Sequence, residues 1–551
     1  MNGHKPHHHI KRNSELGLYA CLARNSPSWR IIALAGWSIL LIDLLLHHSS
    51  ISFHSSLFPL REKRDNSNDS SQNSIAPPLP KDRSDSYKVK ILPSMDDDAL
   101  ELLPSSEFSH IAMIDAGSSG CRVHVYRFGK VKALDGPLYI LPKHVSMKVK
   151  PGLSSFAKNP LEAGATMAGL VDFVKSKVPE ADWGNTPIWL KATAGLRMLH
   201  AKESEAILDS VRGFLGNKAT SPFLFRPQWA SIIPGVEEGA FGWIAYNYLK
   251  RIIGPKKEAN IVPYAVIEMG GASAQVTQLA PSESDVKEIP EEYRYTFIVE
   301  GQHYTLYTHS YLGYGSEQAR EATNRLLLDK KKVTTAEGAL KDPCLNAGFT
   351  RPGVKGTSVY EGPEGIAVIG AAGETPASCL NLVKDLFPAP GPTCAAPIVK
   401  SHSFGCVYQP KFLAESLNFL VFENYFYTAS GIGILPAGHA ADATPTNTFP
   451  IITSAKEMEE AAESVCSTKW DQVNVLYPKD GSSKDSNIKF CFVASVMTAF
   501  LVNGLGIDPN KQLTIQQSVG NSDIEWALGA AYKEAADFLK QNFLRGSSGI
   551  A

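Results

Sequence analysis

The chain has 551 residues, of which 44% are hydrophobic and 20% are charged, so it can bury a sizeable core in three or four domains or in two large ones. This composition excludes a wholly disordered protein, a collagen and a polytopic transporter. The 54 basic and 55 acidic residues give a formal net charge of −1, and nothing in this balance calls for a nucleic-acid partner.

The N-terminal residues predict a membrane anchor. Residues 1–30 form a basic tail, and residues 31–46 are apolar except for Asp43. As a helix, the apolar segment reaches about 24 Å, slightly less than a bilayer core. The positive charge before it predicts a cytoplasmic tail and a translocated remainder, as in a single-pass type II membrane protein. A cleaved signal peptide and a buried core helix are the alternatives, but a good cleavage site is lacking and a core helix would not lie beside a disordered stretch.

Residues 47–106 predict a disordered lumenal stem. Its middle part, 61–86, holds ten charged residues and only three apolar ones besides proline. Such a segment cannot offset its ordering entropy by burial. It contains the only Asn-x-Ser/Thr sequon of the chain, at Asn68, which we expect to be accessible to glycosylation.

An internal repeat is the strongest feature of the remaining sequence. The segments 111–126 and 264–277 each contain a short apolar run, a carboxylate, a Gly/Ser turn and an alternating strand, which predicts a β-hairpin. The carboxylates Asp115 and Glu268 lie 153 residues apart. Glycine turns let backbone N–H groups converge on phosphate oxygens, and a carboxylate at the strand end can hold a divalent cation. Two facing copies predict a clamp for a metal-bound polyphosphate; the alternative is two structural turns.

Three further segments lie between and after the two copies. Thr193-Ala-Gly195 follows a strand and opens a helix, whose N-terminus is either an anion site or purely structural. Glu237 and Glu238 open an expected amphipathic helix that ends near Leu249, and they either stabilise the helix dipole or supply a base for water. The run Gly520–Asp523 is typical of a cap and predicts the start of a final helix.

Six cysteines in the C-terminal half of the exported region predict disulfides. No C-x-x-C motif or cluster of ligand-type His and Cys occurs, which argues against structural zinc. In an oxidising lumen six thiols can form three bridges, and sequential pairing is the simplest of about fifteen connectivities. Buried free thiols are the alternative. Sequential pairing joins Cys344 to Cys379, Cys394 to Cys406 and Cys466 to Cys491.

Taken in order, the two hairpin segments and these three segments resemble the signature regions of the guanosine diphosphatase and ecto-apyrase superfamily of nucleoside phosphatases, over about residues 108–539. The stretches Lys150–Ser155, His309–Gly315 and Phe404–Pro410 look closest to the fungal-type Golgi guanosine diphosphatases. The resemblance implies an α/β fold of two ribonuclease-H-like lobes, as in actin and hexokinase, with the active site in the cleft. Lobe I is expected at 107–233 plus 518–551 and lobe II at 234–517.

The resemblance also implies roles for individual residues. Glu238 is expected to be the catalytic base, with Ser273 and Gln275 positioning the attacking water. Asp115 and Glu268 are expected to hold Ca²⁺ or Mg²⁺, with Mn²⁺ as a further possibility, through its water shell. The other implied substrate-binding residues are Ser118, Ser119, Gly120, Arg122, Thr193, Gly195, Gly270, Gly271, Ala272 and Trp526.

Two aromatic residues and two departures from the family pattern complete the prediction. Phe426 and Tyr427, in an expected strand, either stack on the base or belong to the core. Glu268 stands where the family usually has Asp, which leaves the metal preference open. Cys121 stands where Ser or Thr is common, and we expect it to be a small buried thiol.

The activity that the resemblance implies is metal-dependent hydrolysis of nucleoside diphosphates, GDP and also UDP, to the monophosphate and phosphate. An enzyme of this kind in the Golgi membrane, with its catalytic part in the lumen, removes the by-product of glycosyl transfer. A broader apyrase that also cleaves triphosphates, a kinase on the same fold and an inactive nucleotide-sensing scaffold are the alternatives.

Overall fold

The computed structural model describes residues 109–130, 138–141, 144–254, 257–258, 261–329, 338–354, 358–373, 378–388, 404–416, 418–434, 450–476, 486–520 and 522–547. All of them belong to one compact unit that begins at Tyr87. The expected tail, the anchor at 31–46, the stem and the sequon at Asn68 lie outside the described residues, and they stay predictions.

The first sheet is formed by the N-terminal part of the described chain. Its order is β3-β2-β1-β5-β6, with β4 also paired to β2. Strands β1 and β2 are antiparallel, whereas β1, β5 and β6 run parallel. The bounds are β1 Ser109–Ala116, β2 Cys121–Lys130, β3 Leu138–Ile140, β4 Val145–Val149, β5 Ile188–Ala192 and β6 Ala230–Ile232.

The second sheet has the order β15-β16-β14-β7-β8-β10-β9. The antiparallel hairpin β7–β8 is flanked on its β7 side by the parallel strand β14. The bounds are β7 Ala265–Met269, β8 Ser273–Leu279, β9 Arg294–Val299, β10 Gln302–Leu312, β14 Phe419–Glu423, β15 Ile451–Ser454 and β16 Gln512–Ile515. Two small sheets contain β11 Leu340–Asn346, β12 Thr350–Arg351 and β13 Val368–Ala372, and β17 Ser518–Val519 and β18 Ser522–Asp523.

Both sheets repeat one local order around the hairpins that carry the sequence repeat. Asp115 is paired with Arg122 across β1 and β2, and Glu268 is paired with Gln275 across β7 and β8. These are equivalent positions in the two copies, and each hairpin has a parallel strand beside it, β5 or β14. The predicted α/β fold and both predicted hairpins are therefore confirmed.

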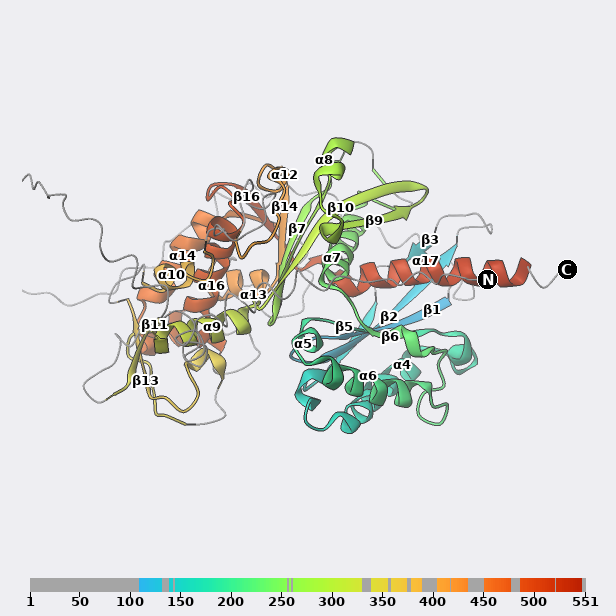
Figure 1. Cartoon of the computed structure of the whole chain (residues 1–551), viewed down its shortest axis with the longest axis horizontal. Coiled ribbons are helices and arrows are strands. Elements are labelled where there is room, and N and C mark those ends of the chain that lie inside the picture. Colours follow the sequence, from blue (N-terminus) through green and yellow to red (C-terminus); the bar gives the residue numbers. More distant parts are fainter. Residues whose placement is uncertain are drawn as a thin grey trace, which may run out of the picture. The chain divides into compact units, whose positions relative to one another are not determined.

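Two long helices, α7 (Gly235–Leu249) and α17 (Trp526–Ser547), pack against each other. Figure 1 shows α17 lying beside α7 and over the strands of the first sheet. Helix α7 also packs on β8 and β10, so 13 of its 15 residues are buried. The predicted amphipathic helix is thus wrong, because α7 has neighbours on nearly every side and keeps little solvent-facing surface.

The other α-helices are divided between the two halves of the described chain. Helices α4 Ala168–Lys177, α5 Ala194–Arg197 and α6 Ala201–Gly216 accompany the first sheet. The second half contains α8 Glu283–Glu288, α9 Ser316–Asp329, α10 Ser378–Lys384, α12 Lys411–Ala414, α13 Asn424–Gly431, α14 Ala455–Ser467, α15 Trp470–Leu476 and α16 Phe490–Ala499.

Strand β1 shows how the core is divided around the first sheet. Ile111 and Met113 pack with residues of α7 and α17, whereas Ala112 and Ile114 pack with residues of α4 and α6. This division follows from the strand itself, because successive side chains point to opposite faces. The first sheet is therefore covered on one side by helices from its own part of the chain and on the other by α7 and α17.

The predicted final helix is present, but the predicted capping run before it is a hairpin, and the expected strand around Phe426 is wrong. Asn424–Gly431 is helix α13, because β14 ends at Glu423, whose positive φ of 59° redirects the chain. Residues Ser518–Asp523 form the hairpin β17–β18 with a turn at Gly520, and α17 begins only at Trp526.

Two of the three predicted disulfides are present, Cys344–Cys379 and Cys466–Cys491. Cys406 is also disulfide-bonded, and its predicted partner Cys394 lies outside the described residues. Cys121 is free and buried, as expected, and burial raises the pKa of its thiol to about 12. The buried thiol is therefore a packing residue.

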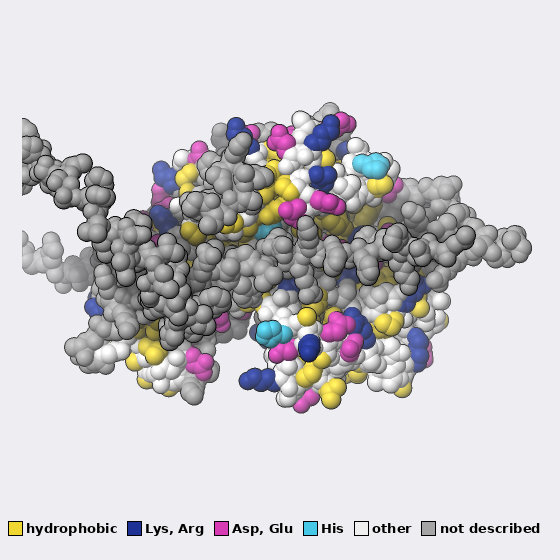
Figure 2. All heavy atoms as spheres, viewed as in Figure 1, with side chains coloured by type: hydrophobic (Ala, Val, Ile, Leu, Met, Phe, Trp, Pro, Cys, Tyr) yellow, Lys and Arg dark blue, Asp and Glu magenta, His cyan; other side chains and the backbone are white. Residues whose placement is uncertain are grey.

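Within the described part of the chain, one helical segment, Asn487–Gly504, is long and apolar enough to cross a membrane. It is 83% buried inside the protein and contributes Phe490, Phe492 and Met497 to the core of the second half. It is therefore a core helix. On the face shown in Figure 2, Lys and Arg side chains are interspersed with Asp and Glu, and neither sign dominates.

Candidate active site

The two glycine turns of the sequence repeat lie against each other. A side-chain carbon added at Gly271, in the second turn, would lie 3.0 Å from Oγ of Ser118 in the first. The second turn is closed by a hydrogen bond of 2.9 Å from the N–H of Gly270 to the carbonyl of Ser273. The structure thus brings Gly270, Gly271 and Ser118 together, while Ser119 is exposed at the tip of the first turn.

Helix α5 supports the first turn from behind. A side-chain carbon at Gly195 would lie 2.9 Å from Cα of Ser118, so only glycine allows this approach. The backbone N–H of Thr193 donates to the carbonyl of Ala116 at 3.3 Å, which ties the end of β5 to the end of β1. Thr193 and Gly195 therefore lie at the first turn, and their predicted contacts to phosphate stay predictions.

Other turn residues are fixed by equally close packing. A side-chain carbon at Gly120 would lie 2.6 Å from the carbonyl oxygen of Val149. The backbone of Ala272, which is buried, accepts a hydrogen bond of 2.8 Å from the N–H of Gly313. These contacts make both turns rigid, which favours a preformed binding surface.

A group of carboxylates gathers at the ends of three strands. Burial raises the pKa of Asp115 well above its usual value, and the Glu525 and Glu238 carboxylates raise it further. Burial likewise raises the pKa of Glu268, as do the Glu238 and Glu423 carboxylates. Burial and then the Glu525 carboxylate raise the pKa of Glu423 to about 7. The mutual repulsion of these acids indicates a site that attracts positive charge.

A divalent cation fits this group. Among the described residues, Oδ1 of Asp115 and Oε2 of Glu268 are buried and have no hydrogen-bond partner. Hard cations prefer such carboxylate oxygens, and a bound cation would offset the repulsion that raises both pKa values. Asp115 and Glu268 are therefore able to hold a cation, directly or through its water shell.

Glu238 lies in the first turn of α7 and forms a buried ion pair with Arg197. Its Oε2 is 2.6 Å from Nη2 of Arg197, and each side chain is only 7% exposed. Arg197 also donates to the carbonyl of Ile233 at 3.1 Å. The ion pair fixes the orientation of the Glu238 carboxylate relative to the second glycine turn.

Ser273 and Gln275 form one hydrogen-bonded network with Ser310. Nε2 of Gln275 donates to Oγ of Ser273 at 2.6 Å and to Oγ of Ser310 at 2.9 Å. Nη2 of Arg197 lies 3.5 Å from the first hydroxyl and 3.3 Å from the second, so the network continues to Glu238. A carboxylate, an amide and two hydroxyls joined in this way can orient a water molecule and accept its proton.

Four other predicted residues lie in different surroundings. Trp526 is buried and stacks on Phe241 of α7, with ring centroids 6.5 Å apart. Phe426 is buried in the core of the second half, whereas Tyr427 is 37% exposed. Arg122 forms an ion pair with Glu525. Their roles toward substrate stay predictions.

Tyr427 and Arg122 line a cavity of about 270 Å³ beside the carboxylates. The hydroxyl of Tyr427 accepts a hydrogen bond of 2.8 Å from Gln517. The cavity gives solvent and ions access to this side of the carboxylate group. Its lining also contains Ser146, Met147, Lys148, Glu423, Asp523, Ile524 and Glu525.

Four residues at the site were missed by the sequence prediction: Arg197, Ser310, Glu423 and Glu525. Glu423 could have been found, because it ends an apolar run, Phe419–Phe422, just as Asp115 and Glu268 end theirs. Ser310 gives no such signal, because its position opposite Gln275 follows only from the pairing of β10 with β8.

The two sheets and the facing glycine turns define an α/β protein in which two closely packed turns lie beside a group of buried carboxylates. The model of the GDA1/CD39 (nucleoside phosphatase) family matches residues 102–547, and the chain belongs to this family. It is therefore an enzyme, a nucleoside phosphatase that hydrolyses phosphoanhydride bonds, and enzymes of this family depend on a divalent cation.

Relatives of two kinds are about equally similar to the chain. The guanosine-diphosphatase of Schizosaccharomyces pombe is 32% identical over 438 residues, which cover 77% of this chain and 73% of that protein. Probable apyrase 5 of Arabidopsis thaliana is 30% identical over 442 residues, 78% of this chain and 82% of that protein. The solved structure of nucleoside triphosphate hydrolases from Neospora caninum shares the fold. The two chains are 15% identical, their TM-score is 0.52, and the match covers 79% of this chain and 94% of that one.

Proposed function

We propose that this enzyme hydrolyses nucleoside diphosphates, GDP and also UDP, to the monophosphate and phosphate. The observation that carries the proposal is the buried network of Glu238, Arg197, Gln275 and Ser273 beside two facing glycine turns. Similarity to fungal guanosine-diphosphatases supports GDP as the substrate. Equal similarity to plant proteins named as probable apyrases makes hydrolysis of triphosphates the second candidate.

The chain's own groups account for each step of an in-line hydrolysis. Amide groups of the two glycine turns hold the oxygens of the terminal phosphates. Gln275 and Ser273 orient the attacking water, and Glu238 accepts its proton while Arg197 keeps the carboxylate in place. Phosphate then leaves with no covalent link to the enzyme.

Asp115 and Glu268 hold the divalent cation in this proposal. When bound, the cation neutralises charge on the terminal phosphates and so assists the departure of the leaving group. The additional methylene of Glu268, compared with the Asp usual in the family, leaves Ca²⁺, Mg²⁺ and Mn²⁺ as candidates.

We further propose a Golgi location with the catalytic part in the lumen. The basic tail at 1–30, the apolar segment at 31–46 and the polar stem support a type II anchor. The disulfides Cys344–Cys379 and Cys466–Cys491 support an oxidising compartment. The repeated strand order supports two ribonuclease-H-like lobes, at 107–233 plus 518–551 and at 234–517.

A substrate panel tests the proposal. Phosphate release from GDP, UDP and ADP and from the matching triphosphates should be fastest with GDP and UDP, and a chelator should abolish it. Faster release from triphosphates would favour the apyrase. No release from any nucleotide in the presence of Mg²⁺, Ca²⁺ or Mn²⁺ would refute the assigned site.

A further inference from the structure

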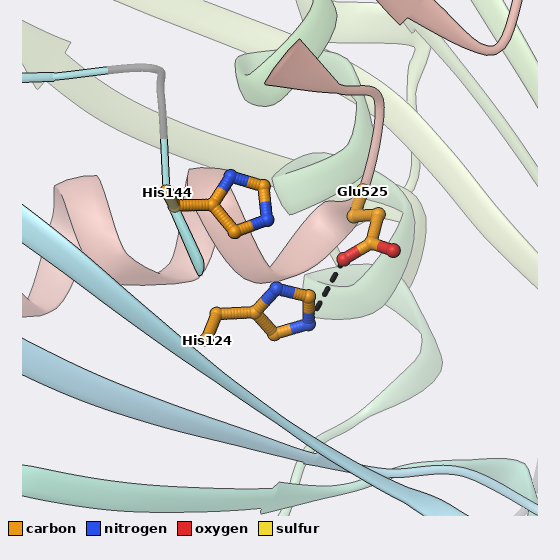
Figure 3. A group of neighbouring side chains, drawn as sticks. All are labelled: His124, His144 and Glu525. Carbon is orange, nitrogen blue, oxygen red and sulfur yellow. Dashed lines mark ion pairs between the residues drawn. The ribbon is translucent and has the colours of Figure 1, made fainter. Parts of the chain in front are cut away.

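A second group of metal-ligating side chains lies beside the carboxylates but shares no residue with Asp115 and Glu268. His124 of β2, His144 just before β4 and Glu525 just before α17 each offer one ligand atom, and these atoms lie within 4.8 Å of one another. Figure 3 shows both imidazole rings and the carboxylate pointing toward a common space.

His124 is the most informative member of this group. Its side chain is fully buried, and Nε2 is paired with Oε2 of Glu525 at 2.9 Å. Among the described residues, Nδ1 of the same ring has no hydrogen-bond partner. An unsatisfied buried polar group destabilises a protein by about 1–3 kcal/mol, so such a group indicates a missing partner.

Glu525 is buried, with its side chain only 10% exposed, and its carboxylate is aimed at the same space. Its other oxygen, Oε1, bonds to Arg122, which leaves Oε2 for the group. Such an outer partner orients a metal-binding carboxylate.

We propose that His124, His144 and Glu525 bind a divalent transition-metal ion, with Zn²⁺ as the best match. Two imidazoles and one carboxylate favour zinc-like ions over Mg²⁺ and Ca²⁺, which prefer oxygen ligands alone. Zinc bonds of about 2.0–2.2 Å require ligand atoms within about 4 Å of one another. The ligand atoms lie within 4.8 Å of one another, so binding in this proposal requires a small shift of at least one side chain, and His144 is the half-buried one of the two histidines.

The cavity beside the carboxylates supplies an entry route for this ion, because Glu525, Arg122 and Asp523 line it. The ion would join three segments that are distant in sequence: β2, the start of β4 and the segment that leads into α17. Its expected effect is therefore to stabilise the attachment of α17 to the first sheet. The inference does not rest on the proposed nucleotide hydrolysis.

The test uses the full chain with Co²⁺ as a spectroscopic probe, in excess Mg²⁺ to saturate oxygen-rich sites. His144→Gln removes one ligand at a half-buried position, and His303→Gln, at an exposed position on β10, is the matched control. The N-terminal histidines His4, His7, His8 and His9 can also bind Co²⁺, but they are the same in the wild type and both variants. Only a difference in Co²⁺ binding between these three proteins therefore reports on the proposed site.

We expect the visible absorption of tetrahedral cobalt in the wild type and in His303→Gln. In His144→Gln it should be lost, with affinity weakened at least about tenfold. Zn²⁺ should raise the thermal unfolding temperature of the first two proteins but not of the third. A His144→Gln protein that binds cobalt with the wild-type spectrum, or a wild type with no tetrahedral spectrum and no zinc-dependent stabilisation, would overturn the proposal. If His144→Gln does not fold, His124→Gln gives the same comparison.

Discussion

Replacing Glu238 by Gln removes the proposed base while it keeps the shape of the side chain. The carboxylate is 7% exposed and lies 2.6 Å from Arg197, so the amide oxygen of Gln can still accept that hydrogen bond. The amide cannot accept a proton from water. Loss of a general base lowers turnover by about 10²–10⁴-fold, which is about 3–5 kcal/mol of activation free energy. We expect kcat for GDP to fall by this factor, with little change in KM.

The same substitution also changes the stability of the protein, and the two effects must be separated. A hydrogen bond to a charged group contributes about 1.5–3 kcal/mol, and a neutral one about 1 kcal/mol. Removal of the charge also relieves the repulsion with Asp115 and Glu268, which offsets part of this loss, so the free energy of unfolding in Glu238→Gln should fall by less than about 2 kcal/mol. Denaturant unfolding measures this loss, and phosphate release at saturating Mg²⁺ measures turnover.

Glu237→Gln is the matched control for this experiment. Glu237 precedes Glu238 in the same helical turn, but its carboxylate interacts with Lys533 and Lys191 instead. The control should keep nearly wild-type turnover. If Glu238→Gln retains activity within about tenfold of the wild type, or if the control loses as much, the role of Glu238 as base is wrong.

Three further predictions follow from the same site. Arg197→Lys keeps the positive charge but loses the guanidinium group, whose two nitrogens contact Ile233 and Glu238, so initial-rate measurements should show a lower kcat at similar KM. An unchanged kcat would exclude a role of Arg197 in positioning the Glu238 carboxylate. Gly271→Ala places a carbon 3.0 Å from Oγ of Ser118, so the KM for GDP should rise about tenfold, and an unchanged KM would mean that substrate does not lie between the turns. The Mg²⁺ concentration for half-maximal activity should fall as pH rises through about 7, because Glu423 loses a proton there, and Glu423→Gln should flatten this dependence.

The sequence predicted the site best where one short pattern carries the chemistry. Asp115 and Glu268 each follow an apolar strand and precede a glycine turn, and the structure places them at equivalent positions of two hairpins. Local residues alone determine such a turn, since glycine permits the close approach and the strand fixes the direction of the carboxylate. Both hairpins could therefore be predicted from the sequence.

Residues that reach the site through tertiary packing could not be predicted from such local sequence patterns. Arg197 meets Glu238 only because α5 and α7 converge, and Ser310 meets Gln275 only through the pairing of β10 with β8. The burial of α7 on nearly every side has the same origin, since it depends on α17, which lies almost three hundred residues further along the chain. Periodicity within one segment does not report such neighbours.

The packing of α17 against β1 and α7 has a consequence for the biosynthesis of this protein. The strands of the first sheet leave the ribosome between residues 109 and 232, yet one face of that sheet gains part of its cover only when residues 526–547 have been made. Until then Ile111 and Met113 lack their final neighbours, although α4 and α6 can already cover the opposite face. Chains released early, or truncated before Trp526, would keep this apolar face exposed and be prone to aggregation or to capture by chaperones.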